Sequence, residues 1–589
     1  MLTVFPIAGS VLALAIKLLG VTALSRRLRS EGSWLAAWLV VQAAMTGTFL
    51  LLSPFNAITP AVTWALLIAA AAISVFSLRS IPLPAISPAG CVVAAIVLAL
   101  MIRANFNNDP TADGQTYGLV RIAWWMNRGS LLPFMPTENF NMFTNEWNGE
   151  LNGLLYGLAA GNVQGFGFGN IEILIVTYLA LQFLIRQLGG QSVLAPAFAL
   201  VLAGSPALIA LATATKGDLL ACTAIVMGAG FALAYRGKPA EHIYLTLTLA
   251  SLGLAVGAKI TSVFAALAVL SLLIKPVRSD WRGALGYAVP GVLAACLFAA
   301  RYFINIVQYG GPLSRAGGET MHPSLTTLLS NISLTARQFV QRFVAEPQQL
   351  DSLCAGLCIS GILILLISPF GFRTIGPRKQ LFIAGAVAWL VTITLVGSYP
   401  FSFRYFLPAI LLAVVPVLAS ASLSRPFRRF PMAVTAACLI AVAGNSWAFV
   451  PPNSIVLTGG RSFYNALLYA SPLTRSTLPW PYFIHDAHIK DLDLDHPDAP
   501  KTIAIFAPLA SVMFVFSGSW AQNRIIMSDT MAGFETLIKD ARPDFAVIVK
   551  AREPERKASA TELATLARAG CGKRFDDNWY TIAKCAVDD

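Results

Sequence analysis

Long apolar runs separated by short polar segments make up most of the first 450 or so residues. A helix crosses a bilayer with about 20 mostly apolar residues, within a range of about 17 to 25. About fourteen runs approach this length, at 5–24, 34–53, 60–78, 88–104, 170–187, 192–212, 217–235, 243–257, 260–274, 284–305, 352–371, 380–398, 404–422 and 431–450. The pattern predicts an all-α polytopic membrane bundle of about fourteen transmembrane helices over residues 1–450.

Two longer polar stretches, 105–169 and 306–351, interrupt the apolar pattern. Within the first, YGLVRIAWWMNRG (117–129) places Leu119, Ile122, Trp125 and Met126 on one helical face. That spacing predicts an amphipathic helix at the membrane interface. Long loops on one face of a bundle are places where a binding or catalytic site can be built.

From about residue 451 the chain turns polar and rich in Pro and Asp. Three short apolar stretches there, at 501–508, 511–518 and 544–550, predict strands. We therefore expect a small α/β domain over residues 451–589. Cys571 and Cys585 are the only cysteine pair in this region, and they could form a disulfide if the domain is exported.

The composition excludes some classes of protein. The chain is 56% hydrophobic and only 12% charged, and its mean hydropathy is +0.67. A soluble enzyme of ordinary composition is excluded. A formal net charge of +13 could suggest a nucleic-acid partner. We expect none, because the Lys and Arg residues lie in short clusters between apolar runs.

The positions of these clusters predict the membrane orientation. Alternate short loops carry positive charge, at 25–32, 77–84, 186–191, 235–242, 275–283, 372–380 and 424–430. The loops between them are poor in Lys and Arg, with single lysines at Lys216 and Lys259. Cytoplasmic loops of membrane proteins carry the excess of Lys and Arg. We therefore expect both termini, both long loops and the C-terminal domain on the non-cytoplasmic side.

A set of short motifs follows in order along the chain. The first long loop contains Asp113, Thr116, Tyr117, Arg121, Trp125, Gly129, Ser130 and Glu150. Later motifs are TKGDLL (215–220), GLAVGAKITSV (253–263), NIVQYGGPL (305–313) and FRYFLP (403–408). Each is weak alone, but in this order they resemble the bacterial GT-C superfamily of glycosyltransferases, with most similarity to glycosyltransferase family 39. The chain departs from that pattern at Gly118, Ile304 and Gly311, where the family has His, Arg and Asn.

The resemblance implies a fold, a location and a reaction. Such enzymes are multi-pass proteins of the bacterial inner membrane, and they transfer a sugar from a polyprenyl-phosphate donor at the periplasmic face. The expected partners are membrane lipid, the lipid-linked donor, and a glycan, lipid or protein acceptor. The cysteines and histidines of this chain make no zinc pattern. The resemblance implies no certain cofactor besides the donor, and it leaves a divalent metal open.

Inverting sugar transfer needs a carboxylate that takes the acceptor proton. The resemblance makes Asp113 the candidate base, with Asp109 as the substitute. Both have structural alternatives, because Asp113 precedes a predicted helix and could be its N-cap, and Asp109 precedes Pro110 and could be a turn residue.

The leaving phosphate needs cations, because it gains negative charge as the sugar bond breaks. Arg404 and Lys216 are the first candidates and Lys259 is the third; the alternative is that they are interface anchors whose side chains reach the headgroups. The remaining candidates for substrate binding are Tyr117, Trp125, Glu150, Asp218 and Tyr405. Trp125 could instead belong to an interfacial aromatic belt, and Asp218 could stabilise a helix dipole.

Two other functions also fit a polytopic chain with this charge pattern. A transporter or lipid flippase would show as many helices, but such proteins usually carry ionisable residues near mid-span and repeated halves. A glycan ligase that uses a lipid pyrophosphate donor would need a similar site.

Overall fold

A computed structural model gives the fold of the chain. The structure describes residues 8–28, 31–77, 87–106, 118–133, 146–312, 326, 329–331, 333–334, 337, 376–396, 403–444, 492–494, 498–507, 514–518, 521–550, 559–576 and 580–585. The candidate residues Asp109, Asp113 and Tyr117 lie outside these ranges, as do the predicted span 352–371 and most of the stretch 306–351.

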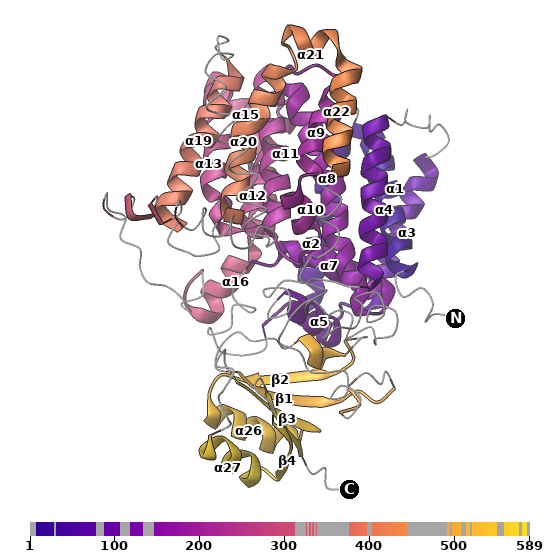
Figure 1. The fold of residues 1–589 in the computed structure, drawn as a ribbon, viewed down its shortest axis with the longest axis vertical. Helices are drawn as coiled ribbons and strands as arrows, with labels where there is room; N and C mark the ends of the chain where they lie inside the picture. The colour runs from indigo at the N-terminus through magenta and orange to yellow at the C-terminus, as the bar shows by residue number, and fades with distance from the viewer. Residues whose placement is uncertain are drawn as a thin grey trace.

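Helices form most of the described chain and run side by side in one bundle (Figure 1). In the N-terminal half they are α1 (Ala8–Leu28), α2 (Ser33–Leu52), α3 (Pro60–Ser77), α4 (Pro88–Phe106), α5 (Leu119–Arg128), α7 (Asn148–Ala160), α8 (Phe168–Gln187), α9 (Ala195–Ala203), α10 (Pro206–Ala212) and α11 (Asp218–Gly237). They continue with α12 (Ile243–Ala258), α13 (Val263–Leu270), α14 (Ile274–Ser279), α15 (Trp281–Phe298), α16 (Ala300–Tyr309), α19 (Pro377–Val396), α20 (Phe403–Ala421), α21 (Arg425–Arg429) and α22 (Pro431–Gly444). Short 3₁₀ turns are η1 (Ser53–Phe55), η4 (Val163–Gly167) and η5 (Ile260–Ser262).

The chain is a multi-pass membrane protein. Among the described residues, six helices are long and apolar enough to cross a bilayer, and α9 with α10 makes a seventh candidate. Every predicted span except 352–371 coincides with one or more described helices, but several are too short to pass this length test. The count of fourteen spans is therefore not confirmed.

Two of the predicted spans are broken helices. The run 192–212 divides into α9 and α10, which meet at 64°. Pro206 has no N–H to continue α9, and the Ser205 side chain caps the new helix by accepting a hydrogen bond from Leu208 N. The run 284–305 divides at Ala299 into α15 and α16. Each break redirects the chain inside the bundle.

The basic loops meet at the end of the bundle away from the C-terminal domain, where α21 lies (Figure 1). Glu31 accepts a hydrogen bond from Gln187 at 2.7 Å and pairs with Lys238 at 3.7 Å. Arg378 Nε donates to the Leu188 carbonyl at 2.6 Å. Four loops that the charge pattern assigns to one side of the membrane are thus neighbours in space.

A buried ion pair joins four helices within the bundle. Lys17 of α1 lies 2.8 Å from Glu172 of α8, and both side chains are almost fully buried. The Glu172 carboxylate also accepts hydrogen bonds from Trp38 Nε1 at 2.6 Å and from the Tyr156 hydroxyl at 2.7 Å. Because the Glu172 carboxylate is fully hydrogen-bonded, this pair fixes how α1, α2 and α7 pack on α8.

The C-terminal domain is a five-stranded mixed sheet with two helices. Its elements are β1 (Thr502–Phe506), η9 (Phe514–Ser517), β2 (Arg524–Ser528), α26 (Met531–Ala541), β3 (Phe545–Val549), α27 (Ala560–Arg568), β4 (Cys571–Asp576) and β5 (Tyr580–Cys585). The strand order is β2-β1-β3-β5-β4, with β1 parallel to β2 and β3 and the β3–β5 and β5–β4 pairs antiparallel.

The strand predictions for this domain were right in part. The stretches 501–508 and 544–550 contain β1 and β3. The prediction of a strand at 511–518 was wrong. The described part of this stretch forms the 3₁₀ turn η9, which packs against α5 instead of pairing in the sheet. Strands β2, β4 and β5 were missed because each contains charged residues: Arg524 begins β2, Asp576 ends β4, and Lys584 is the second-last residue of β5.

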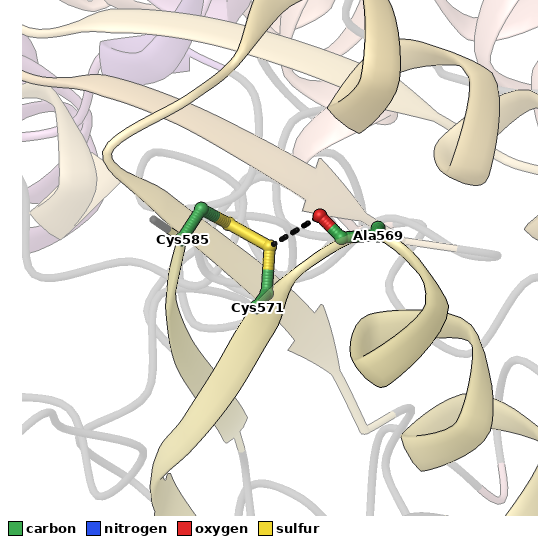
Figure 2. The surroundings of a disulfide bond; sticks show 3 residues. All are labelled: Ala569, Cys571 and Cys585. Atoms are coloured by element: carbon green, nitrogen blue, oxygen red, sulfur yellow. Dashed lines mark hydrogen bonds between the residues drawn. A yellow bond between two sulfur atoms is a disulfide. The ribbon is translucent and has the colours of Figure 1, made fainter. Parts of the chain in front are cut away.

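A disulfide joins Cys571 and Cys585, the pair for which the sequence predicts one (Figure 2). The two residues lie directly opposite each other in the β4–β5 ladder. Figure 2 shows the bond crossing between these two strands near the end of α27. It ties the last strand of the domain to the edge strand.

Candidate active site

Elements far apart in the sequence end at one place, the end of the bundle next to the C-terminal domain (Figure 1). Glycines permit the close approach. A Cβ atom at Gly217, before α11, would overlap the Ala258 carbonyl at the end of α12. A Cβ atom at Gly257 would overlap the Phe298 carbonyl at the end of α15. Larger residues at either position would push these helix ends apart.

Two buried asparagines hold the connecting turns. Asn148, the first residue of α7, donates to the Phe298 carbonyl at 2.8 Å. Asn170 of α8 donates to carbonyls of the turn before α11, those of Leu211 at 3.2 Å and of Ala214. Lys216 follows in this turn and is buried. The turns that carry the candidate residues are thus anchored to the bundle by side-chain amides.

Four predicted site residues lie together on one side of this place. Asp218, at the start of α11, is 3.8 Å from Lys259 Nζ. Lys259 lies 4.7 Å from the centre of the Tyr405 ring. The Arg404 guanidinium lies 5.2 Å from the same centre and 3.3 Å from the Tyr405 hydroxyl. Neither Asp218 carboxylate oxygen has a hydrogen-bond partner among the described residues.

A second buried ion pair lies between α5 and α7. Arg121 is 3.7 Å from Glu150 and also donates to the Glu146 carbonyl at 2.6 Å. It lies over the Trp125 ring, 5.8 Å from its centre. Burial raises the pKa of Glu150 to about 7, although Arg121 opposes this. Glu150 lies in α7, outside the candidate membrane spans, and can exchange a proton near neutral pH.

Glu146, which the sequence did not single out as a site residue, connects the two pairs. Its carboxylate accepts a hydrogen bond from Ile260 N at 2.7 Å, next to Lys259. It is also 3.5 Å from the Tyr302 hydroxyl of α16. Glu146 thereby fixes the segment after α12 against the beginning of α7, and it places the Lys259 pair and the Arg121 pair in one cluster.

Arg301, in the first turn of α16, was missed completely. It is only 3% exposed, and its guanidinium lies 5.1 Å from the centre of the Trp147 ring. Among the described residues it has no carboxylate at ion-pair distance, and its Nε has no hydrogen-bond acceptor. The charge that acts most strongly on Arg301 is the positive charge of Arg121. A buried, unneutralised guanidinium is costly unless an anion binds to it.

A weak signal for Arg301 existed in the sequence. The motif NIVQYGGPL resembles a family element that is preceded by Arg, where this chain has Ile304. Arg301 lies three residues earlier, on the same face of α16. This chain lacks the arginine at the family position, but it has Arg301 one helical turn earlier.

The described residues of the cluster carry a net positive charge. Five basic residues lie here with three carboxylates: Arg121, Lys216, Lys259, Arg301 and Arg404 with Glu146, Glu150 and Asp218. Buried polar atoms normally have hydrogen-bond partners. Here both Asp218 carboxylate oxygens, the Arg301 Nε atom and the Glu150 Oε2 atom lack them among the described residues. The arrangement can bind an anion and still offers acceptors for hydroxyl groups.

The structure changes the interpretation of the tryptophans. The predicted amphipathic helix exists as α5, but residues 119–125 are all buried, so it does not lie on a membrane surface. Trp125 and Trp147 pack edge to face with ring centres 6.0 Å apart and are also buried. They line the cation cluster and are not part of an exposed aromatic belt.

Asp109, Asp113 and Tyr117 lie outside the described residues, so their positions relative to the cluster stay predictions. The described chain resumes at Gly118, whose Cα packs against the Thr215 carbonyl in the turn that carries Lys216. Within the described part of the chain, no three His, Cys, Asp or Glu residues are grouped as a metal site would require.

No protein-family model and no curated protein sequence matches this chain. Two solved structures of ArnT from Cupriavidus metallidurans are similar to it. The apo structure has 13% sequence identity and a TM-score of 0.45, covering 84% of this chain and 97% of ArnT. The structure bound to undecaprenyl phosphate has 14% identity and a TM-score of 0.46, covering 85% of this chain and 99% of ArnT.

Proposed function

We propose that this protein is a membrane glycosyltransferase of the GT-C type, which transfers a sugar from a polyprenyl-phosphate donor to an acceptor at the periplasmic face. The observation that carries the proposal is the buried cationic cluster, in which the Arg301 guanidinium has no carboxylate at ion-pair distance among the described residues.

The cations fit the leaving group of this reaction. When the sugar–phosphate bond breaks, negative charge develops on the phosphate oxygens, and preorganised donors stabilise it. Arg301 and Arg404 offer planar guanidinium groups that suit phosphate oxygens, and Lys259 adds a compact charge. Stacking on Trp147 and Tyr405 holds the two guanidiniums in place before the donor arrives.

The carboxylates fit the other half of the reaction. The acceptor hydroxyl must lose a proton as it attacks, and in an inverting transfer a general base on the opposite side of the sugar takes it. Asp113 is the proposed base, with Asp109 as the alternative. Asp218 and Glu150 each keep an oxygen without a hydrogen-bond partner among the described residues, and they are proposed to bind sugar hydroxyls.

The position of the cluster fits a lipid-linked substrate at the outer face. It lies at the end of the bundle opposite the basic loops, which the positive-inside rule assigns to the cytoplasm. The C-terminal domain covers this same end. We infer that the donor enters from the lipid, that both termini are periplasmic, and that the C-terminal domain helps to select the acceptor.

The test uses purified protein in lipid nanodiscs with sugars linked to polyprenyl phosphate, and it measures release of free polyprenyl phosphate. Asp113→Asn should lower turnover by about 10²- to 10⁴-fold while donor binding persists. Asp109→Asn is the matched control. Near-normal turnover in Asp113→Asn would exclude Asp113 as the base, because Asn caps a helix about as well as Asp. If no donor tried is cleaved but the lipid crosses the bilayer, the protein is a flippase and the proposal is wrong.

A further inference from the structure

A second polar pocket lies where the C-terminal domain meets the membrane module. Its volume is about 290 Å³. It is separate from the buried cluster and is lined by Asn56, Trp124, Asn127, Arg128, Arg524 and Ile525. None of these six residues is acidic, while two are arginines and two are asparagines, so the walls offer hydrogen-bond donors and positive charge.

Both domains are needed to form this pocket. Asn127, near the end of α5, donates to the Ala521 and Gln522 carbonyls at 3.3 and 3.2 Å. These two residues immediately precede Asn523 and β2, so the bonds hold the beginning of β2 against α5. One wall therefore comes from the membrane module and the other from the C-terminal domain.

The two arginines approach the pocket from opposite sides. Arg128 is the last residue of α5, and Arg524 is the first residue of β2. Burial lowers the pKa of Arg128, and the positive charge of Arg524 lowers it further. Two like charges that line one pocket repel each other, and an anion bound between them would attract both.

We propose that Arg128 and Arg524 form a phosphate-binding site at the junction of the two domains. Guanidinium groups bind phosphate oxygens through paired hydrogen bonds. The Asn56 and Asn127 side chains and the Trp124 ring would contact the group that carries the phosphate. The ligand is either a lipid headgroup or a soluble phosphate compound, since both present the same chemistry.

The position of the pocket suggests that a bound phosphate connects the C-terminal domain to α5. Helix α5 directs Arg121 and Trp125 towards the buried cluster, while Trp124 and Arg128 line the junction. A phosphate held by both arginines would fasten the C-terminal domain to the helix that holds the partner of Glu150. The site does not depend on the proposed sugar transfer, so it can stand if that function fails.

The experiment measures binding of radiolabelled inorganic phosphate to the full-length protein in phosphatidylcholine nanodiscs at low ionic strength. The buried cluster is a second anion site, so all proteins carry Arg301→Gln, which weakens that site equally in every comparison. Arg128→Gln and Arg524→Gln should each weaken phosphate binding by about tenfold or more, because each removes charge-assisted hydrogen bonds. Arg574→Gln, an exposed arginine on the same domain, is the matched control and should bind as before.

The source of the phosphate is distinguished by a second arm with phosphatidylglycerol in the nanodiscs. Loss of inorganic phosphate binding in that lipid identifies a headgroup as the ligand, and unchanged binding identifies a soluble compound. Equal phosphate affinity in the parent, Arg128→Gln and Arg524→Gln proteins would overturn the site. Both arginines reach solvent, so the melting temperature should stay the same, and it is measured for each variant to separate loss of binding from loss of folding.

Discussion

Replacing Arg301 by Met should make the protein more stable and much less active. Arg301 is 3% exposed and has no carboxylate partner among the described residues, so the folded protein bears the cost of a buried charge next to Arg121. Replacing buried ionic groups by apolar residues of similar volume is often stabilising, by about 1–4 kcal/mol. Met has nearly the length of Arg and can still pack on Trp147.

The loss of function follows from the same charge. A hydrogen bond to a charged group contributes about 1.5–3 kcal/mol, which corresponds to a loss of about ten- to 150-fold in donor affinity. Removing one donor from the developing oxyanion typically lowers the rate by about 10²- to 10³-fold. We therefore expect donor binding and turnover to fall together while stability rises.

The assay pairs unfolding with turnover. Unfolding of the purified protein in detergent gives the free energy difference, and release of polyprenyl phosphate gives the rate. Lys17→Met is the contrasting control, because it removes a buried cation that is paired with Glu172 at 2.8 Å. Breaking such a pair costs about 3–5 kcal/mol. If Arg301→Met were destabilised as strongly as Lys17→Met, Arg301 would be a structural residue and the reasoning would be refuted.

Three further outcomes are expected. Burial raises the pKa of Glu150 from 4.5 to about 7, so the folded state binds this proton more tightly than the unfolded state does. The protonated carboxyl therefore contributes its full share to the free energy of unfolding below about pH 4.5. About 3 kcal/mol of that free energy is lost as the pH rises to about 7. Glu150→Gln should flatten that part of the curve in thermal unfolding, and an unchanged curve would contradict it. Replacing both Cys571 and Cys585 by Ala should destabilise the C-terminal domain by about 3 kcal/mol, because the bond closes a loop with a sequence separation of 14, and thiol labelling of the unfolded, unreduced wild type should miss both cysteines. Alkaline phosphatase fused after Val450 should be active, whereas activity of fusions within 372–380 would reverse the orientation.

Residue type and local pattern were enough to predict much of the fold. Apolar length located the helices, because a segment that spans lipid must satisfy its backbone polar groups internally. The breaks at Ser205 and Ala299 were missed, since an apolar run does not show whether the chain continues straight or bends inside the bundle. The helix over 119–128 was also predicted, but the burial of residues 119–125 on all sides was not.

The candidate site was predictable only where the chain resembles known motifs. Arg404, Lys259 and Asp218 were named from three separate segments. The structure places Arg404 and Lys259 over the Tyr405 ring, and Asp218 lies 3.8 Å from Lys259. Glu146 was passed over, because a carboxylate that accepts a backbone hydrogen bond from a distant turn leaves no local pattern. The carboxylates of 107–117 stay predictions, since they lie outside the described residues.

The sequence by itself determined that this chain is a membrane bundle with a polar C-terminal domain, because hydropathy and cysteine positions are local properties that each segment carries with it. Only the tertiary structure decided which charges are neutralised. Arg301 and Lys17 are both single basic residues in apolar surroundings, yet Lys17 meets Glu172 from 155 residues away while Arg301 meets Trp147 and another arginine. Whether a buried charge stabilises the fold or is available to bind a ligand depends on its neighbours in space, and helix packing alone sets those neighbours.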